Sequence, residues 1–439
     1  MFSTIRNAWR IPDLRKKILF TLLVIVVFRL GSVIPVPFLD AVKLQALMAS
    51  VDASGSALSY INMLTGGAFS YATIFAMGIT PYINSSIIMQ LLSIAIPALE
   101  RLNKSGEEGR KKIASITRFV TVGLGLAQGT AFFFYLHNSG ITVYSNGASA
   151  VFAAIVIILC FTAGTAVVMW LGEQINEKGI GNGISIILFA GIVARLPVTV
   201  GQLWSFFSFA LTNPTTQWPY FIFVPLFIVL FLFVIWVIVF MQDAERRIPV
   251  QYAKRVVGRK MYGGQSSHIP VKVAGSGVMP VIFASAILSI PSTIQLFTGT
   301  PAEGSFWAGF FSAFAPNGWL YMTLYFLLIL AFAYFYMSIQ YNPMEMANNI
   351  RSQSGAIPGI RPGKPTADFI MKVMSKLTLI GAFFLAFVAL VPLIYGALTG
   401  MSALSMGGTS LIIMVGVALE TVKQMEAQMM MRHYKGFLD

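Results

Sequence analysis

Charged side chains are scarce in this sequence of 439 residues, because aspartate, glutamate, lysine and arginine make up only 10% of it. About a quarter of the residues in a soluble domain are charged, so this scarcity excludes an ordinary soluble protein. The single cysteine, Cys160, excludes a disulfide within the chain, and its apolar neighbours predict that it is packed. The three histidines, His137, His268 and His433, lie far apart and outside the apolar runs. They do not have the spacing of metal ligands, so we expect no metal site.

Acidic residues are missing from the middle of the apolar runs. Glu173, Asp243, Glu345 and Glu420 fall at the ends of runs or between them. Ion-coupled carriers keep ionisable residues at membrane depth, where they bind Na⁺ or H⁺. The pattern disfavours such a carrier, although an inverted-repeat carrier for a small solute remains the alternative function. No serine, histidine and aspartate group on neighbouring spans indicates an enzyme, and we expect no cofactor.

Apolar runs fill the sequence instead, since hydrophobic residues make up 56% of it. The runs are roughly 20 residues long, the length of a helix that crosses a hydrocarbon core of about 30 Å. We predict an all-α membrane protein with spans at about 17–35, 70–97, 113–136, 150–171, 183–200, 219–241, 276–297, 318–340, 368–392 and 403–423. Five spans per half would make the second half inverted relative to the first. We therefore expect halves at 1–212 and 213–439 around a central pore.

Basic residues gather on one side of the predicted membrane. Of the 30 lysines and arginines, all but Arg29, Lys43 and Arg195 precede the first span, follow an even-numbered span or start the ninth. By the positive-inside rule, both termini are cytoplasmic. Arg29 lies in the outer half of the first span, where its stem can reach the interface or a neighbouring helix. We expect a structural role for it.

The first long cytoplasmic loop, at about 242–275, has the pattern of a basic hairpin. Its extended, β-branched stretches are Ile248–Tyr252 and Ile269–Val273, and the turn-rich tip between them is Gly258–Gly264. Such stretches around a turn predict two antiparallel strands. The hairpin would project from the membrane on the cytoplasmic side.

The second long loop, at about 341–368, predicts a short helix and a second tip. Asn342–Glu345 supplies an Asn cap, a proline at the first position and a glutamate at the third. Gly355 can end this helix, and the turn-rich stretch Ile357–Gly363 follows. Basic loops orient a membrane protein and lie near anionic lipid. Two ordered, projecting basic loops also suggest a docking surface for a large acidic or RNA-containing partner.

As a single helix, the apolar stretch Leu58–Leu99 would be about twice as long as the membrane core is thick. Gly66 and Gly67 offer a break within it. We predict a short apolar segment, Leu58–Thr65, and a true span from Ser70 that bends near Pro81. The short segment cannot cross the membrane, so it lies in the interface or is buried in a central cavity as a plug.

The second span carries several polar side chains across membrane depth. They are Thr80, Asn84, Ser85, Ser86 and Gln90. Such side chains usually form hydrogen bonds with neighbouring helices. The alternative is that they face a path used by polar cargo.

The glycine-rich stretch Gly179–Gly183 has some features of a phosphate-binding loop. It follows a membrane helix instead of a strand, however, and no Lys-Ser or Lys-Thr pair follows it. A tight turn between the fourth and fifth spans is the better interpretation.

Five stretches in the same order along nearly the whole chain resemble the SecY family of bacterial protein-translocation channels. They are Gly172–Ser185, Phe75–Ile83, Tyr252–Arg255 with Gln265–Lys272, Pro358–Gly363 and Gly407–Leu411. The resemblance implies a channel that moves unfolded polypeptides across the membrane and releases membrane segments sideways into lipid. It implies SecE and SecG subunits, a SecA ATPase or a ribosome as driving partner, and a bacterial plasma membrane.

The resemblance also assigns roles to residues. The implied pore ring is Ile79, Ile83, Ile184, Leu188, Ile282 and Ile413, with leucine at one position where isoleucine is common. The implied plug is Leu58, Ile61, Met63, Leu64, Gly66 and Gly67. Asn84 and Gln90 would line a lateral gate between spans two/three and seven/eight. Partner docking would fall to Arg361, Arg259, Lys260 and Arg255.

Overall fold

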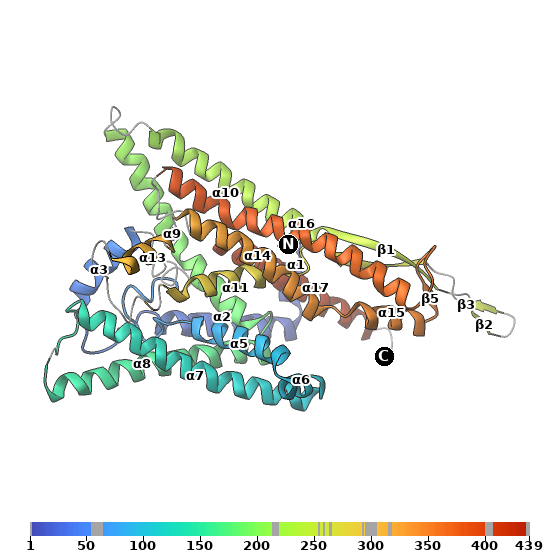
Figure 1. The fold of residues 1–439 in the computed structure, drawn as a ribbon, viewed down its shortest axis with the longest axis horizontal. Coiled ribbons are helices and arrows are strands. Elements are labelled where there is room, and N and C mark those ends of the chain that lie inside the picture. Colours follow the sequence, from blue (N-terminus) through green and yellow to red (C-terminus); the bar gives the residue numbers. More distant parts are fainter. Residues whose placement is uncertain are drawn as a thin grey trace.

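The computed structural model describes residues 2–53, 65–144, 146–212, 219–252, 255–257, 260–262, 266–291, 294, 305–314, 318–399 and 407–435. Its elements in chain order are α1 (Phe2–Arg10), α2 (Pro12–Gly31), α3 (Ala41–Ala53), α5 (Thr80–Ala95), α6 (Pro97–Lys104), α7 (Glu107–Asn138), α8 (Ala148–Lys178), α9 (Gly183–Thr212), α10 (Pro219–Asp243), β1 (Glu245–Tyr252), β2 (Arg255–Val257), β3 (Lys260–Tyr262), β4 (Ser266–Lys272), α11 (Met279–Leu288), α13 (Phe306–Ala313), α14 (Trp319–Gln340), α15 (Pro343–Ser352), β5 (Gly355–Ala356), α16 (Lys364–Thr399) and α17 (Gly407–Lys435). Figure 1 shows a helical bundle with the strands and α15 at one end, and with α3 and α13 at the opposite end.

The long helices match the predicted spans in position. Within the described residues, α7, α8, α9, α10, α14 and α16 are long and apolar enough to cross a membrane. Helices α5 and α6 form a further candidate that is bent by 105°. The other predicted spans are occupied by α2, by α17 and by the short apolar helix α11. Helix α2 has charged residues in its first two turns and Arg29 in its last turn, whereas the charged residues of α17 lie from its middle onward. The helix ends differ from the predicted ends by several residues.

The second predicted span differs from the prediction in its first part. The helix begins at Thr80, not at Ser70, because residues 65–79 run as a series of turns. Gly66 and Gly67 have φ angles of 68° and 91°, in the left-handed region that glycine adopts without strain. Pro81 does not bend the helix but lies in its first turn, where proline is favoured. The bend lies instead between α5 and α6.

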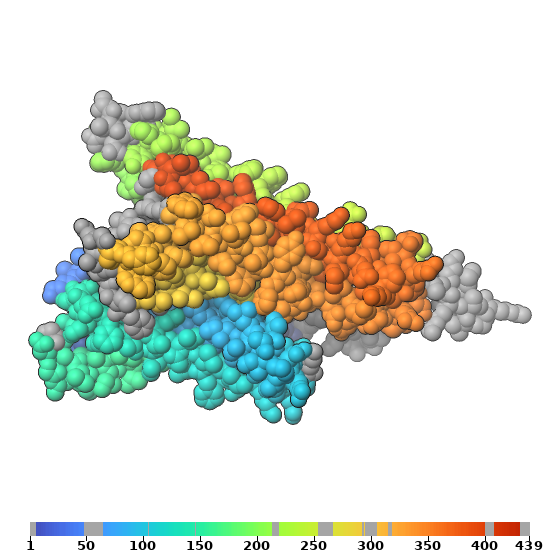
Figure 2. All heavy atoms as spheres, in the orientation of Figure 1, coloured from blue at the N-terminus to red at the C-terminus, as the bar shows by residue number. Residues whose placement is uncertain are grey.

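The helices pack in two groups that follow the chain. In the first part of the chain α5 packs against α7, α7 against α8 and α8 against α9; in the second, α11 and α16 pack against α14, and α10 and α16 against α17. Helices α9 and α17 are in contact across the two groups. Figure 2 shows the blue and teal surface of the first group lying along the yellow and orange surface of the second.

The predicted basic hairpin is confirmed, and it includes a strand that the sequence did not reveal. Strand β1 pairs antiparallel with β4 from Glu245 opposite Lys272 to Gln251 opposite Ser266. On its other edge β1 pairs with β5, where Tyr252 lies opposite Gly355. The sheet order is therefore β4-β1-β5, and the two cytoplasmic loops of the prediction form one folded unit.

The second loop confirms the predicted helix start and corrects its end. The side chain of Asn342 accepts a hydrogen bond from the backbone N–H of Glu345, as an N-cap does. Helix α15 ends at Ser352, and Ser354 takes the left-handed conformation with φ 57°. Gly355 is not the residue that ends the helix but the first residue of β5. A Cβ atom there would lie 3.0 Å from both Ile350 Cγ2 and Tyr252 Cε1.

Candidate functional site

Six apolar side chains from distant parts of the chain belong to one large apolar cluster, which also contains residues of α2 and α8. The six are Ile79, Ile83, Ile184, Leu188, Ile282 and Ile413. The side chains of Ile79, Leu188 and Ile413 are buried, and the other three are half-buried. Of the helices that carry these six residues, α5 and α9 belong to the first group, whereas α11 and α17 belong to the second. The structure therefore brings together every residue of the predicted pore ring, and their role as a seal stays a prediction.

Glycine fixes how α9 begins beside α8. The backbone of Gly183 packs so tightly on α8 that a Cβ atom there would lie 1.9 Å from the carbonyl oxygen of Gly172. The Asn176 side chain accepts a hydrogen bond of 2.8 Å from the Gly183 N–H, and Asn182 Oδ1 accepts one from Ile184 N. The glycine-rich stretch is thus a tight turn, as predicted. It sets the position of Ile184 and, one turn later, of Leu188.

The turns before α5 are also held by close contacts. Thr65 is buried, and its Oγ1 accepts a hydrogen bond from Phe69 N. Gly78 has a φ of 54°, and a Cβ atom there would lie 2.8 Å from Thr65 Cγ2. Because no other residue fits there without strain, this glycine determines where Ile79 lies as the chain enters α5.

The first turn of α17 packs closely against α16. A Cβ atom at Gly408 would lie 2.6 Å from the carbonyl oxygen of Val388. The hydroxyl groups of Tyr325 on α14 and Thr409 on α17 form a buried hydrogen bond of 2.9 Å. These two contacts anchor the first turn of α17, and Ile413 follows one turn later.

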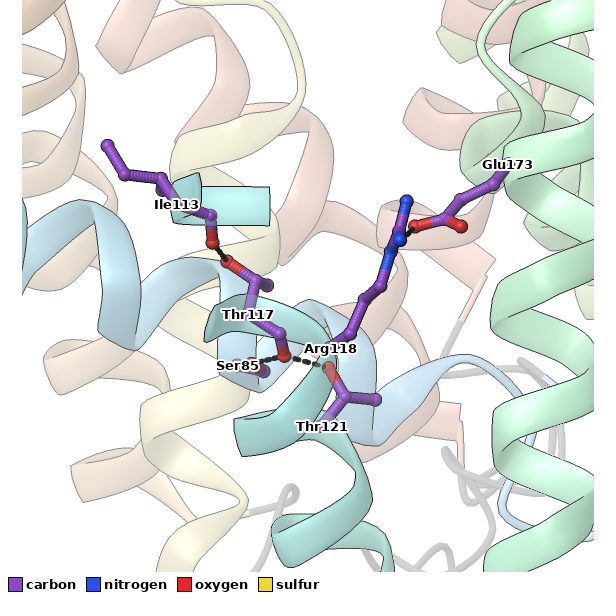
Figure 3. A network of polar contacts seen from close by, with 6 residues as sticks. All are labelled: Ser85, Ile113, Thr117, Arg118, Thr121 and Glu173. Atoms are coloured by element: carbon purple, nitrogen blue, oxygen red, sulfur yellow. Dashed lines mark hydrogen bonds and ion pairs between the residues drawn. The ribbon is translucent and has the colours of Figure 1, made fainter. Parts of the chain in front are cut away.

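A polar network joins α5, α7 and α8, as Figure 3 shows. The hydroxyl of Ser85, which is fully buried, donates to the Thr117 carbonyl at 2.8 Å, and Thr121 Oγ1 donates to the same oxygen at 2.7 Å. Nearby, Arg118 Nε lies 2.7 Å from Glu173 Oε1 and ties α7 to α8. Of the two interpretations of the polar residues on the second span, packing against a neighbouring helix is therefore correct for Ser85.

Asn84 and Gln90, the predicted gate residues, are half-buried on α5. Helix α5 packs against α7, and α11 packs against α14. The predicted gate lies between these two helix pairs, along the border of the blue and yellow surfaces in Figure 2. The structure places both residues on the helix that the prediction requires, and their role stays a prediction.

The loop unit at the end of the bundle has its own apolar core. It contains Ile248 and Val250 of β1, Ile350 of α15, and Ile370 and Met374 of α16. This core seats the hairpin and the second loop on the start of α16. Sequence patterns indicated the hairpin and the helix separately, but β5 has only two residues and gave no signal.

Arg361 lies exposed at the second tip, just before α16. Its carbonyl accepts a hydrogen bond of 2.9 Å from Thr366 Oγ1, which is buried. Gly359 and Gly363 on either side have φ angles of 81° and 102°. The backbone of the tip is thus fixed, and the Arg361 residue it carries is exposed.

Several predicted site residues lie outside the described residues. They are the plug residues Leu58, Ile61, Met63 and Leu64, and Arg259 at the hairpin tip. Gly66 and Gly67 are described, as are the backbones of Arg255 in β2 and Lys260 in β3, which lie on the two paired strands of the hairpin tip. Cys160 is free and half-buried, and it packs beside a cluster of buried apolar residues as expected. Within the described ranges, no three acidic, cysteine or histidine side chains lie close enough together to hold a metal ion.

Comparison with known sequences gives one consistent result. The family model described as SecY matches residues 73–422. The protein translocase subunit SecY of Streptomyces coelicolor is 44% identical over 450 residues, and the match covers 100% of both chains. The protein of the same description from Bacillus subtilis is 43% identical over 442 residues, again with 100% of both covered. That from Thermotoga maritima is 42% identical over 442 residues, with 100% of this chain and 98% of the other covered.

Comparison with solved structures identifies the fold. A structure described as that of a protein conducting channel has a TM-score of 0.63 at 20% identity, covering 94% of this chain and 92% of the other. Sec61 in the canine ribosome-channel complex from the endoplasmic reticulum gives the same four values. These channels are all-α membrane proteins of ten helices, and the fold of this chain is of that class.

Proposed function

The chain belongs to the SecY family and has the function of a protein-conducting channel, and we propose that its six clustered apolar side chains form the seal of the pore. The observation that carries this proposal is the single cluster itself. Side chains from α5, α9, α11 and α17, and from Ile79 just before α5, meet where the two helix groups join. None of the six carries a polar atom that could hold water.

An apolar collar suits a channel that passes unfolded chains. Apolar constrictions exclude water and ions by dewetting, because neither finds a hydrogen-bond partner there. Isoleucine and leucine side chains also fit around any sequence without binding it tightly. A charged lining would instead stabilise hydrated ions in the pore. The collar therefore seals the pore because it offers water and ions no hydrogen-bond partners, and not because it forms a specific contact with them.

The border between the two helix pairs is the proposed lateral gate. Opening between α5–α7 and α11–α14 would expose the pore to lipid and release membrane segments sideways. Asn84 and Gln90 would line this opening. Leu58–Gly67 is the proposed plug, whose segment leads directly into the anchored turns at Thr65. The two halves of the channel would be residues 1–212 and 213–439.

The loop unit is the proposed docking site for the motor that drives transport. Arg361 is exposed at its second tip, and the sequence of the hairpin tip contributes the basic residues Arg255, Arg259 and Lys260. The partners would be a SecA ATPase or a ribosome, with SecE and SecG as further subunits. The similar canine channel is described in a ribosome complex, which supports a ribosome as one such partner.

The chain is a multi-pass membrane protein, and the proposed location is the bacterial plasma membrane with both termini in the cytoplasm. The distribution of basic residues supports that orientation. A passive channel driven by an external partner needs no catalytic group or cofactor of its own, so the chain itself would not be an enzyme.

Site-specific crosslinking tests the channel against the small-solute carrier. A photocrosslinking residue at Ile282, in the proposed ring, should react with an exported polypeptide that is stalled by a bulky folded domain. The matched control is Leu232 on α10, whose side chain is 60% exposed on the outside of the bundle. Crosslinks at Leu232 that equal those at Ile282, or none at Ile282, would refute a polypeptide path through the ring.

A further inference from the structure

Arg29 is a charged residue on the membrane helix α2, in the half that leads to the outer side. Ionisable residues within spanning helices are rare because burying their charge is costly, and they usually have a function. The Arg29 side chain is half-buried instead of extending into solvent. Of the two expectations for its stem, contact with a neighbouring helix is what the structure shows, through Ala190 on α9.

The guanidinium of Arg29 contacts the backbone of two other segments. Its Nη1 donates to the carbonyl oxygen of Gly66, and its Nη2 donates to that of Ala190 on α9, each at 3.5 Å. Gly66 belongs to the turns that lead to α5. A single side chain on α2 thus joins the two segments that carry the first four ring residues.

Small residues make this arrangement possible. Gly66 has a φ of 68°, and a Cβ atom there would lie 2.8 Å from the carbonyl oxygen of Gly191 and 2.9 Å from Arg29 Nη1. Any larger residue at Gly66 would push the turns away from α9 or displace the guanidinium. The close approach of three backbone segments around one cation is therefore a built feature of this site.

Neighbouring contacts fix Arg29 in place. Phe28 stacks on Phe75 with ring centroids 5.9 Å apart. At Gly31, a Cβ atom would lie 2.0 Å from Phe75 Cε2. Helix α2 is therefore pressed against the turns on both sides of Arg29 in sequence. Four residues after Phe75 comes Ile79, and two residues before Ala190 comes Leu188, so both contacts lie beside ring positions.

We propose that Arg29 is a positioning residue for the pore seal, an inference that rests on the proposed function of the ring. Its guanidinium holds the Gly66 and Ala190 carbonyls at a fixed separation, which keeps Ile79 and Ile83 in contact with Ile184 and Leu188. Arginine suits this task because its planar group offers five donors and can reach two carbonyls at once. If the two segments separate, its donors lose these two carbonyl partners, which opposes opening.

The resting conductance of the channel tests this proposal. Arg29→Met keeps the length of the side chain and removes its donors, and Arg29→Lys keeps the charge but not the fork. Gly66→Ala disturbs the same contact from the opposite side. The matched control is Lys43→Met on α3, which removes one positive charge from an exposed ion pair with Asp40. Purified complexes are measured in planar bilayers, and the conductance is divided by the amount of intact complex.

We expect the Met and Ala variants to raise the resting conductance several-fold, the Lys variant to raise it less, and Lys43→Met to match the wild type. Wild-type conductance in Arg29→Met would refute the proposal. If Arg29→Met does not assemble, Gly66→Ala decides: an intact complex that does not leak would show that Arg29 only supports folding. Crosslinking at Ile282 separates this failure from failure of the ring itself, because it reports the polypeptide path independently.

Discussion

Serine in place of Ile83 and Ile413 is expected to make the closed channel leak ions. Both residues belong to the cluster at the junction of the helix groups, where Ile413 is 2% exposed and Ile83 is half-buried. Serine removes apolar surface from the collar and adds a hydroxyl that forms hydrogen bonds with water. Water that enters the constriction therefore gains a partner that isoleucine does not offer.

The size of the effect follows from burial. Burying an isoleucine side chain contributes about 1.5–3 kcal/mol relative to exposing it. At the lower end of this range, about 1.5 kcal/mol, each buried site shifts the balance between the dry and wet constriction by a factor of about ten, since about 1.4 kcal/mol corresponds to tenfold. Ile413→Ser alone should thus raise the conducting fraction about tenfold. The double variant should exceed this by less than a further tenfold, because Ile83 is only half-buried.

Single-channel recordings of the purified complex in potassium chloride measure this fraction directly. The matched control is leucine at the same positions, since it keeps volume and polarity and should change conductance little. The serine variants should also transport proteins with defective signal sequences more readily. Equal leak in the serine and leucine variants would refute the seal, because the argument depends on the hydroxyl and not on substitution as such.

Three further predictions concern the loops and the plug. Arg361→Glu should lower ATPase-driven export at least tenfold while the protein stays inserted at normal abundance, because Arg361 is exposed and the reversed charge would repel acidic groups on a docking partner; normal export would refute its docking role. Deletion of Leu58–Thr65 should leave the complex assembled but raise its resting conductance in planar bilayers, whereas unchanged conductance would favour an interfacial segment. Membrane-impermeant labels should reach a tag near Gly263 only from the cytoplasm and one near Asn146 only from outside, and labelling of Gly263 from outside would reverse the orientation.

The sequence predicted the features that depend on local composition. Apolar run lengths located the spans, β-branched stretches around a turn located the hairpin, and the Asn342–Glu345 pattern located the start of α15. Each of these signals comes from residues within a few positions of one another. The ring was different, because isoleucines on membrane helices usually pack; only the resemblance selected these six, and the structure then placed them in one cluster.

The features that were missed depend on contacts between distant residues. The turns at residues 65–79 are as apolar as a helix, so hydropathy did not distinguish the two, and the positive φ of Gly78 became visible only with its contact to Thr65. Strand β5 exists because Tyr252 lies opposite Gly355, about a hundred residues later in the chain. The eight-residue helix α13 also lies in a stretch that was expected to connect two spans.

The pairing of β5 with β1 has a consequence for exchanging parts between related channels. The hairpin contributes β1 to the sheet, the second loop contributes β5, and both share the apolar core around Ile350 and Ile370. A hairpin transplanted alone from a relative would meet a strand edge and a core that were not selected with it. Chimeras should therefore exchange the two loops as a pair. The affinity of a binding protein raised against one tip should also depend on the position of the other tip.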